Sequence, residues 1–153
     1  MCSELELAYL AGIIDGEGCI DIYKHDAGPR GARKYRFTMR VTVGMGRPEL
    51  PKWLQQLFGG TLGVSPAKFN GRSAEWRWRV CSLKALYLLN KIYPYLVLKK
   101  DQAQIAMSFQ KLQSSWQKTY GGAKTPQVVM EQEEELWKAL KNTRGKKYHE
   151  VQV

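Results

Sequence analysis

Residues 34–43 alternate between polar and apolar side chains over ten positions, and this pattern constrains the fold more than any other feature of the chain. The even positions hold Lys, Arg, Thr, Arg and Thr, whereas the odd positions hold Tyr, Phe, Met, Val and Val. Because the side chains of a strand point alternately to its two faces, the segment predicts a strand with one solvated and one buried face. Residues 74–80 repeat the alternation, with Glu75, Arg77 and Arg79 on the polar side. The two segments predict a sheet with a basic, solvated face.

Helix and turn signals divide the rest of the chain into short elements. Ser3 followed by Glu6 is the signature of a capping box, which predicts a helix from residue 4 to about residue 14. Pro48 and Gly59 bracket a second helix over about 48–58. The other predicted elements are strands over 19–25 and 60–68, a hairpin turn over 69–72, a helix that Ser82 caps and that ends before Pro94, and helices from about Asp101 and from Thr125-Pro126.

This order is αββαββα with an extra C-terminal helix, which predicts an α+β fold. No linker or low-complexity tract interrupts it, so we expect a single domain over residues 1–153. Its core would span about 3–117, and the C-terminal helix and basic tail would span about 124–153.

The chain carries an excess of positive charge, which favours a polyanionic partner. Its net charge is +10, and residues 20–80 hold twelve Lys or Arg against four Asp or Glu. Nucleic acid is the first partner that such a charge indicates, and an acidic membrane surface is the second. The longest apolar run, residues 7–14, is too short to span a bilayer, and the first residues do not show a signal-peptide pattern, so we expect neither a membrane span nor a signal peptide.

The number and spacing of the cysteines indicate the redox environment in which the chain works. There are three, widely spaced and without a CxxC pair, which argues against a disulfide framework and against a zinc cluster. A reducing, intracellular setting is therefore expected, with nucleoid, organelle and nucleus all left open.

The basic face of the predicted sheet has two interpretations. An ordinary solvated face accounts for either strand taken alone. Two strands of the same sign favour nucleic acid, because Arg reads guanine edges in the major groove and other cations neutralise phosphates. Trp76 and Trp78 share the opposite face with Val80, so we expect them in the core rather than stacked on bases.

Two places in the chain break local electrostatic preferences. Asp15 and Glu17 put negative charge at the negative end of the first helix, and Lys99 and Lys100 put positive charge where a later helix begins. A divalent cation would compensate the acids and a phosphate would compensate the lysines, which together suggest metal-assisted phosphodiester cleavage. The alternative for the acids is a simple tight turn, and the residues alone leave the two interpretations even.

Small residues line one side of the first helix. Ala8, Ala11 and Gly12 leave that side nearly bare, so another backbone can approach closely. The chain holds one copy of this helix, so the close neighbour would be the same helix in a second subunit. Such a twofold dimer would bring two Glu17 side chains together.

Residues 10–18, Leu-Ala-Gly-Ile-Ile-Asp-Gly-Glu-Gly, resemble the motif of the LAGLIDADG homing endonucleases, with six of nine positions identical. Residues 94–103 are similar to the later Leu-Lys-x-x-Gln-Ala segment of that family, and the element order extends the resemblance over nearly the whole chain. The resemblance implies a homodimer whose motif helices pack at the twofold axis. It also implies antiparallel sheets in the DNA major groove, Mg²⁺ at the base of the motif helices, and cleavage of both strands with 3′ overhangs.

The resemblance also assigns roles to single residues. Glu17 matches the metal-binding acid, and Gly16 matches the residue that lends a backbone carbonyl to the metal. Asp15 matches the acid that ties the helix ends together. It is therefore also expected in the metal site and at the dimer interface. Lys99 matches the basic residue near the scissile phosphate.

Two departures from the family pattern stand out. Position 17 is Glu where Asp is commoner, and residues 44–46 are Gly-Met-Gly where the family often carries a polar, water-positioning residue. Arg47 is the predicted substitute in that catalytic role.

The predicted DNA-contacting residues are Asp21, Tyr23, His25, Arg30, Arg33, Lys34, Arg36, Thr38, Arg40, Thr42, Arg72, Glu75, Arg77, Arg79 and Lys100.

The function expected from these features is site-specific cleavage of double-stranded DNA by a homodimer. Mg²⁺ is the expected cofactor, and Mn²⁺ or Ca²⁺ would occupy the same sites. No membrane and no small-molecule substrate is expected. The alternative is an RNA-binding intron maturase or a non-cleaving DNA-binding regulator on the same scaffold.

Overall fold

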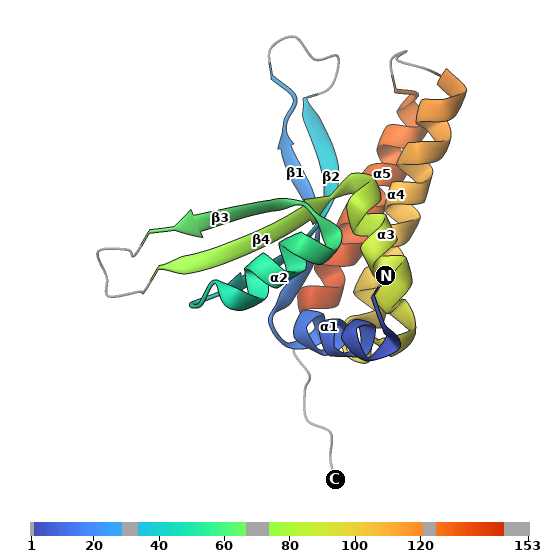
Figure 1. Cartoon of the computed structure of the whole chain (residues 1–153). Coiled ribbons are helices and arrows are strands. Elements are labelled where there is room, and N and C mark those ends of the chain that lie inside the picture. The colour runs from blue at the N-terminus through green and yellow to red at the C-terminus, as the bar shows by residue number, and fades with distance from the viewer. Residues whose placement is uncertain (1, 29–33, 67–73, 121–124, 146–153) are drawn as a thin grey trace.

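The computed structural model describes residues 2–28, 34–66, 74–120 and 125–145. Its elements, shown in Figure 1, are α1 (Glu4–Gly16), β1 (Gly18–Asp26), β2 (Tyr35–Met45), α2 (Glu49–Phe58), β3 (Thr61–Ser65), β4 (Glu75–Cys81), α3 (Ser82–Ile92), the short 3₁₀ helix η1 (Tyr93–Tyr95), α4 (Lys100–Tyr120) and α5 (Gln127–Gly145). The predicted order αββαββα is confirmed, and both α4 and α5 follow it.

The four strands form one antiparallel sheet in the order β1-β2-β4-β3. The alternation predicted for β2 is confirmed, because Phe37, Met39, Val41 and Val43 are buried while their neighbours are not. The strand β1 is an edge strand, and β2 pairs with it from Tyr35 to Val43.

The helices cover the buried face of this sheet. Leu10, Ile14, Leu88 and Phe109, from three helices, are almost fully buried in one apolar cluster with the inner face of the strands. Helices α4 and α5 run side by side, and α1 crosses one end of the molecule (Figure 1). The cluster includes Leu140 of α5, so the last helix also packs on the core.

The two tryptophans of β4 differ in burial. Trp78 lies in the core as predicted, and its Nε1 donates a hydrogen bond to the Gly59 carbonyl at 2.8 Å. Trp76 is half-buried, and the Lys52 ammonium lies 5.3 Å from its ring centroid. The core position predicted for Trp76 is therefore a correction, because its ring is only partly buried.

The two predicted helix caps have different outcomes. The capping box of α1 is confirmed, since the Ser3 hydroxyl accepts from the Glu6 N–H and the Glu6 carboxylate accepts from the Ser3 N–H. The cap predicted at Ser82 is wrong. Strand β4 runs directly into α3, so Cys81 occupies the capping position without a side-chain bond. Ser82 is instead the first residue of α3, and its backbone has a left-handed φ of +50° where the strand passes into the helix.

Some predictions lie outside the described residues: the hairpin turn over 69–72 and the DNA contacts of Arg30, Arg33 and Arg72. Within the described ranges, no helix combines the length and the apolar character that a membrane crossing requires.

Candidate active site and nucleic-acid interface

The ammonium group of Lys99 caps the C-terminal end of α1. Its Nζ atom donates to the carbonyl oxygens of Ile14 at 2.8 Å, of Asp15 at 2.8 Å and of Gly18 at 2.7 Å. The last carbonyls of a helix lack partners within the helix and carry the negative end of its dipole. The two electrostatic anomalies of the sequence therefore compensate each other: the lysine neutralises the helix end.

Asp15 connects the same two segments through its carboxylate. Its Oδ2 accepts from the backbone N–H of Val97 at 2.8 Å, and its Oδ1 accepts from that of Lys99 at 2.9 Å. Side chains thus reach in both directions between the end of α1 and residues 97–99. This arrangement fixes the position of the helix end from which Gly16 and Glu17 project.

The surroundings of Lys99 alter its acidity. Burial lowers the pKa of the Lys99 ammonium from its ordinary value of 10.5, and the positive charge of Arg144 lowers it further. The negative charges of Asp15 and Glu17 oppose this effect. A desolvated cation with acidic neighbours is typical of functional sites.

Glu17 is the last residue of this arrangement and is accessible to a ligand. It occupies the C-cap position of α1, and its side chain is exposed. Its carboxylate forms no hydrogen bond or ion pair with any residue of the described ranges. Gly16 is exposed as well, and no atom lies within 4 Å of the point where a Cβ would stand. Both residues are therefore exposed at this end of α1.

The described residues of one chain do not form a complete metal site. Among the described residues, no group of three or more His, Cys, Asp or Glu side chains is placed to hold an ion. Mg²⁺ takes six oxygen ligands, usually few from the protein and the rest from water or phosphate. The exposed Glu17 carboxylate and a backbone carbonyl fit such a partial shell, whereas the Asp15 oxygens are each occupied by an amide.

Two predicted site residues lie in other surroundings. Arg47 follows β2 and pairs with Glu49 at 2.8 Å, and this contact raises the pKa of Arg47. Within the described residues, it makes no polar contact with Glu17 or Lys99. Lys100 is exposed at the first position of α4, with its ammonium 5.5 Å from the Tyr93 ring centroid.

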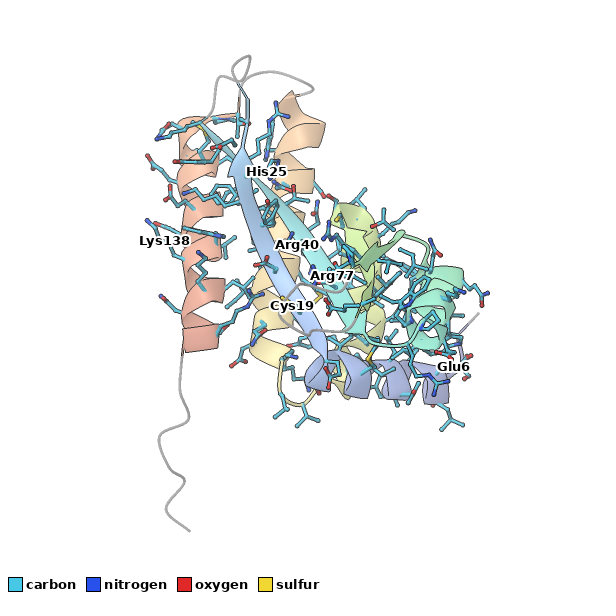
Figure 2. The ribbon with its side chains drawn as sticks, turned by 90° about the vertical axis from the view of Figure 1, so that its left-hand side faces the viewer. Glu6, Cys19, His25, Arg40, Arg77 and Lys138 are labelled. Atoms are coloured by element: carbon cyan, nitrogen blue, oxygen red, sulfur yellow. The ribbon has the colours of Figure 1, made fainter. Side chains whose placement is uncertain are left out.

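The predicted DNA-contacting residues of the strands share the outer face of the sheet. Opposite one another in the register stand Asp21 and Arg40, Tyr23 and Thr38, His25 and Arg36, and Thr42 and Arg79. Glu75 and Arg77 continue this face on β4, and Lys34 is exposed just before β2. Figure 2 labels His25, Arg40 and Arg77 along this region. The outer face is thus basic and open, as the alternation predicts.

Arg144 is a residue of this face that the sequence did not reveal. It lies near the end of α5, and its Nη1 approaches Asp21 Oδ1 at 3.2 Å. Its Nη2 donates to the Ile20 carbonyl on the edge strand and to Cys19 Sγ. In sequence it is one of several basic residues in the C-terminal segment, which fit a phosphate contact and a basic tail equally well, and no local signal identifies its partners.

The exposed side of α1 differs in part from the prediction. Ala8 and Gly12 lie on it, but Ala11 is a correction: its side chain is 0% exposed and packs in the core, so it cannot contact a second copy. Tyr9 is exposed, and Leu5 is 84% exposed. The side that a second helix could meet is therefore apolar rather than bare.

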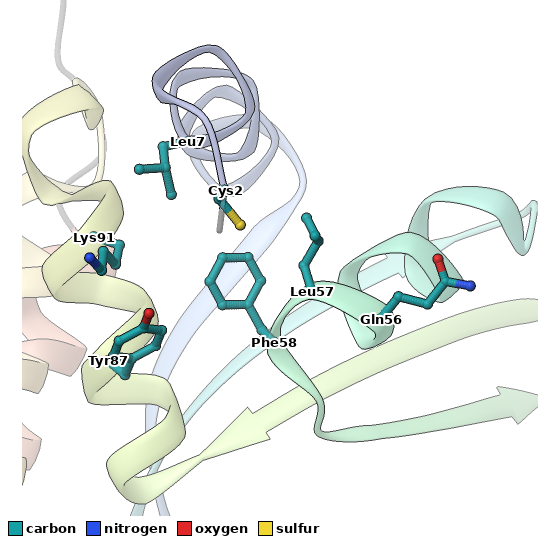
Figure 3. A pocket seen from close by; sticks show the side chains of 7 residues that line it. All are labelled: Cys2, Leu7, Gln56, Leu57, Phe58, Tyr87 and Lys91. Atoms are coloured by element: carbon teal, nitrogen blue, oxygen red, sulfur yellow. The ribbon is translucent and has the colours of Figure 1, made fainter.

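A pocket of about 330 Å³ lies between α1, α2 and α3 (Figure 3). Its lining residues are Cys2, Leu7, Gln56, Leu57, Phe58, Tyr87 and Lys91. None of the predicted catalytic, metal or DNA-contacting residues is among them, so this pocket is separate from the candidate site.

Comparison with known proteins gives structural matches alone, since no family model and no curated protein matches the chain. The homing endonuclease I-CvuI, in complex with DNA, matches with a TM-score of 0.74 at 22% identity, over 97% of this chain and 87% of that chain. The archaeal intron-encoded homing endonuclease I-Vdi141I, complexed with DNA, matches with a TM-score of 0.74 at 14% identity, over 97% and 89%.

A third match differs in length. I-SmaMI bound to an uncleaved DNA target has a TM-score of 0.64 at 16% identity, over 89% of this chain but only 45% of that chain. The LAGLIDADG homing endonuclease I-GzeII, in complex with its DNA target, matches over a similar 44% of its length. The chain has the fold of the LAGLIDADG homing endonucleases.

Proposed function

We propose that the chain is a site-specific endonuclease that cleaves double-stranded DNA as a homodimer. The observation that carries the proposal is the exposed carboxylate of Glu17 at the end of α1, which has no partner among the described residues and lies beside the half-buried ammonium of Lys99. The basic outer face of the sheet supplies a surface for DNA. The matched structures, described as homing endonucleases with DNA, support the same function.

The exposed side of α1 supports the homodimer. Leu5, Tyr9, Val97 and Leu98 are exposed apolar residues on α1 and on the segment bound to its end, and Val97 is 79% exposed. At Gly12 no atom lies within 4 Å of a Cβ position, so a second backbone can approach there. The chain corresponds to less than half of I-SmaMI, so two copies match that length. Burying apolar surface between the two copies would stabilise the pair.

The homodimer would complete the metal site. Two copies of α1 packed side by side would bring two Glu17 carboxylates and two Gly16 carbonyls together, and DNA phosphate and water would supply the other oxygens. I-CvuI complexes are described with Mg and with Ca, which are cations of this type. Mg²⁺ is the proposed cofactor, and when bound it would stabilise the charge that develops on the phosphate.

The other residues would position the reacting groups. Asp15 and Lys99 would hold the end of α1 rigid, so that Glu17 keeps its place when DNA binds. The three N–H donors of the Lys99 ammonium already bond to carbonyl oxygens. Lys99 would therefore act on a nearby phosphate through its positive charge and not through a hydrogen bond. The two copies would cut both strands of a roughly palindromic site and leave 3′ overhangs.

The substitution Glu17→Gln tests the proposal. It removes the charge and keeps the size, so DNA binding should persist while cleavage falls by roughly 10²–10³-fold, as when a charge-stabilising group is lost. Glu4→Gln, an exposed acid at the other end of the same helix, is the matched control and should cleave as the wild type does. The substrate is duplex DNA selected from a randomised library by the wild-type chain, incubated with Mg²⁺.

Two outcomes would contradict the proposal. Unchanged cleavage by the Glu17→Gln variant would remove Glu17 from the metal site. A wild-type chain that binds the selected duplex but leaves both strands intact with Mg²⁺ and with Mn²⁺ would favour the alternative, a maturase or a regulator on this scaffold.

A further inference from the structure

The carboxylate of Asp21 is shared between two arginines from distant parts of the chain. Its Oδ2 accepts from Nε of Arg40 at 3.1 Å and from Nη2 of Arg40 at 2.9 Å. Its Oδ1 pairs with Nη1 of Arg144 at 3.2 Å. The Asp21 side chain is only 15% exposed, so its oxygens have little surface left for an outside ligand.

Arg40 is held on a second side by an aromatic ring. Its guanidinium carbon lies 4.0 Å from the centroid of the Tyr23 ring, a cation–π arrangement. The Tyr23 ring stacks in turn on His25, with ring centroids 5.6 Å apart and planes 13° apart. The guanidinium is therefore fixed in plane and in direction before any ligand binds.

The contacts leave one edge of Arg40 available. A guanidinium has five N–H groups, and Asp21 takes the Nε–H and one on Nη2. Two donors on Nη1 and one on Nη2 remain, and no other residue of the described ranges bonds to them. An edge with one N–H on each terminal nitrogen fits two adjacent acceptors. The N7 and O6 atoms of guanine form such a pair in the major groove, and two phosphate oxygens form another.

We propose that Asp21 is a positioning residue, which fixes Arg40 as a reader of guanine, and that Arg144 of α5 holds Asp21 in place from the other side. This inference rests on the proposed function, since it presumes that the sheet binds DNA. Asp21 would make no contact with a base. Its negative charge would otherwise weaken binding to a polyanion, so its value lies in directing the arginine.

Arg144 suits this role because it anchors to the backbone as well. Its second terminal nitrogen donates to the carbonyl of Ile20, an acceptor on the edge strand β1. The end of α5 is thereby attached to the reading face of the sheet. Helix α5 would in this way influence which DNA sequence the chain selects.

The test is selection from a randomised duplex DNA library by the full-length wild-type chain and four variants. Asp21→Ala removes the positioning carboxylate, and Arg40→Lys keeps the charge but not the paired donors. Arg144→Ala removes the outer support. Lys138→Ala is its matched control, because Lys138 is a cation of the same helix whose ion pair is with Glu134 and not with Asp21. Thermal melting of each variant checks that it folds.

The wild type should select a guanine at one symmetric pair of positions. That preference should fall by about 5- to 150-fold in Asp21→Ala and Arg40→Lys, the discrimination expected of one bidentate contact. It should fall in Arg144→Ala and persist in Lys138→Ala. Affinity for random duplex should not drop in Asp21→Ala, because a negative charge has been removed.

The contrary outcomes separate this inference from the proposed function. A wild type that enriches no sequence would contradict site-specific binding itself. A wild type that enriches sites whose guanine preference survives Asp21→Ala would overturn only the positioning role. A uniform loss of affinity in Arg40→Lys, with base preferences intact, would show that Arg40 binds phosphate and overturn the assignment to guanine.

Discussion

The Nζ atom of Lys99 lies 2.7 Å from the carbonyl oxygen of Gly18, a residue 81 positions earlier in the chain. With the carbonyls of Ile14 and Asp15, this contact places a half-buried cation at the end of the helix that bears Glu17. The lysine therefore serves the geometry of the site as well as its charge. It holds in place the helix end that bears Glu17, the proposed metal ligand.

Replacing Lys99 by Met should destabilise the fold. Three partly buried carbonyls would lose a charged donor, and the expected cost is about 2 kcal/mol in the free energy of unfolding. Urea denaturation at neutral pH measures this cost. Lys100→Met is the control, because Lys100 is exposed and its ammonium lies over the Tyr93 ring without an ion pair to any described residue, so its midpoint should hardly move. Equal midpoints for the two variants would show that the cap adds no stability.

The lowered pKa of Lys99 predicts a pH dependence of stability. Between its folded pKa and the unfolded value near 10.5, the unfolded chain binds more protons at this residue than the folded chain does. The contribution of Lys99 to the free energy of unfolding should therefore rise with pH through that alkaline window. The difference in unfolding free energy between wild type and Lys99→Met, measured from pH 7 to pH 10, isolates this contribution. A difference that shrinks as pH rises would contradict the burial of the charge.

Local patterns in the sequence predicted the sheet well and the site only in part. The alternation of residues 34–43 is a property of neighbouring positions, and β2 followed it. Lys99 neutralises the end of α1 across more than 80 residues of sequence, so local patterns could not predict the contact. Those patterns suggested instead that a metal compensates the acids and that a phosphate compensates the lysines. Ala11 was misplaced because small size alone does not tell which side of a helix faces the core. The contacts of Arg144 were not predicted, because its partners lie on the first strand, far away in sequence.

Substitution of Gly12 by Leu should block the homodimer while leaving the monomer folded. No atom lies within 4 Å of a Cβ at Gly12, and Leu is the better helix former. Sedimentation equilibrium should show a shift from dimer to monomer, and cleavage should be lost with it. Gly46→Leu, at an equally open position after β2, is the control and should stay dimeric. If the Gly12→Leu variant remains a dimer, the twofold contact does not run through this side of α1.

DNA binding should depend steeply on salt, because the outer face of the sheet is basic. If the homodimer neutralises 6–10 phosphates, its affinity should fall by roughly 10³–10⁵-fold between 50 and 200 mM salt. Arg36→Ala removes one exposed cation from each copy, so the slope of log affinity against log salt should shrink by about 2. Lys91→Ala removes an equally exposed cation from α3, beside the separate pocket, and should leave the slope unchanged. Equal slopes for all three proteins, measured by fluorescence anisotropy on one selected duplex, would show that DNA does not lie on this face.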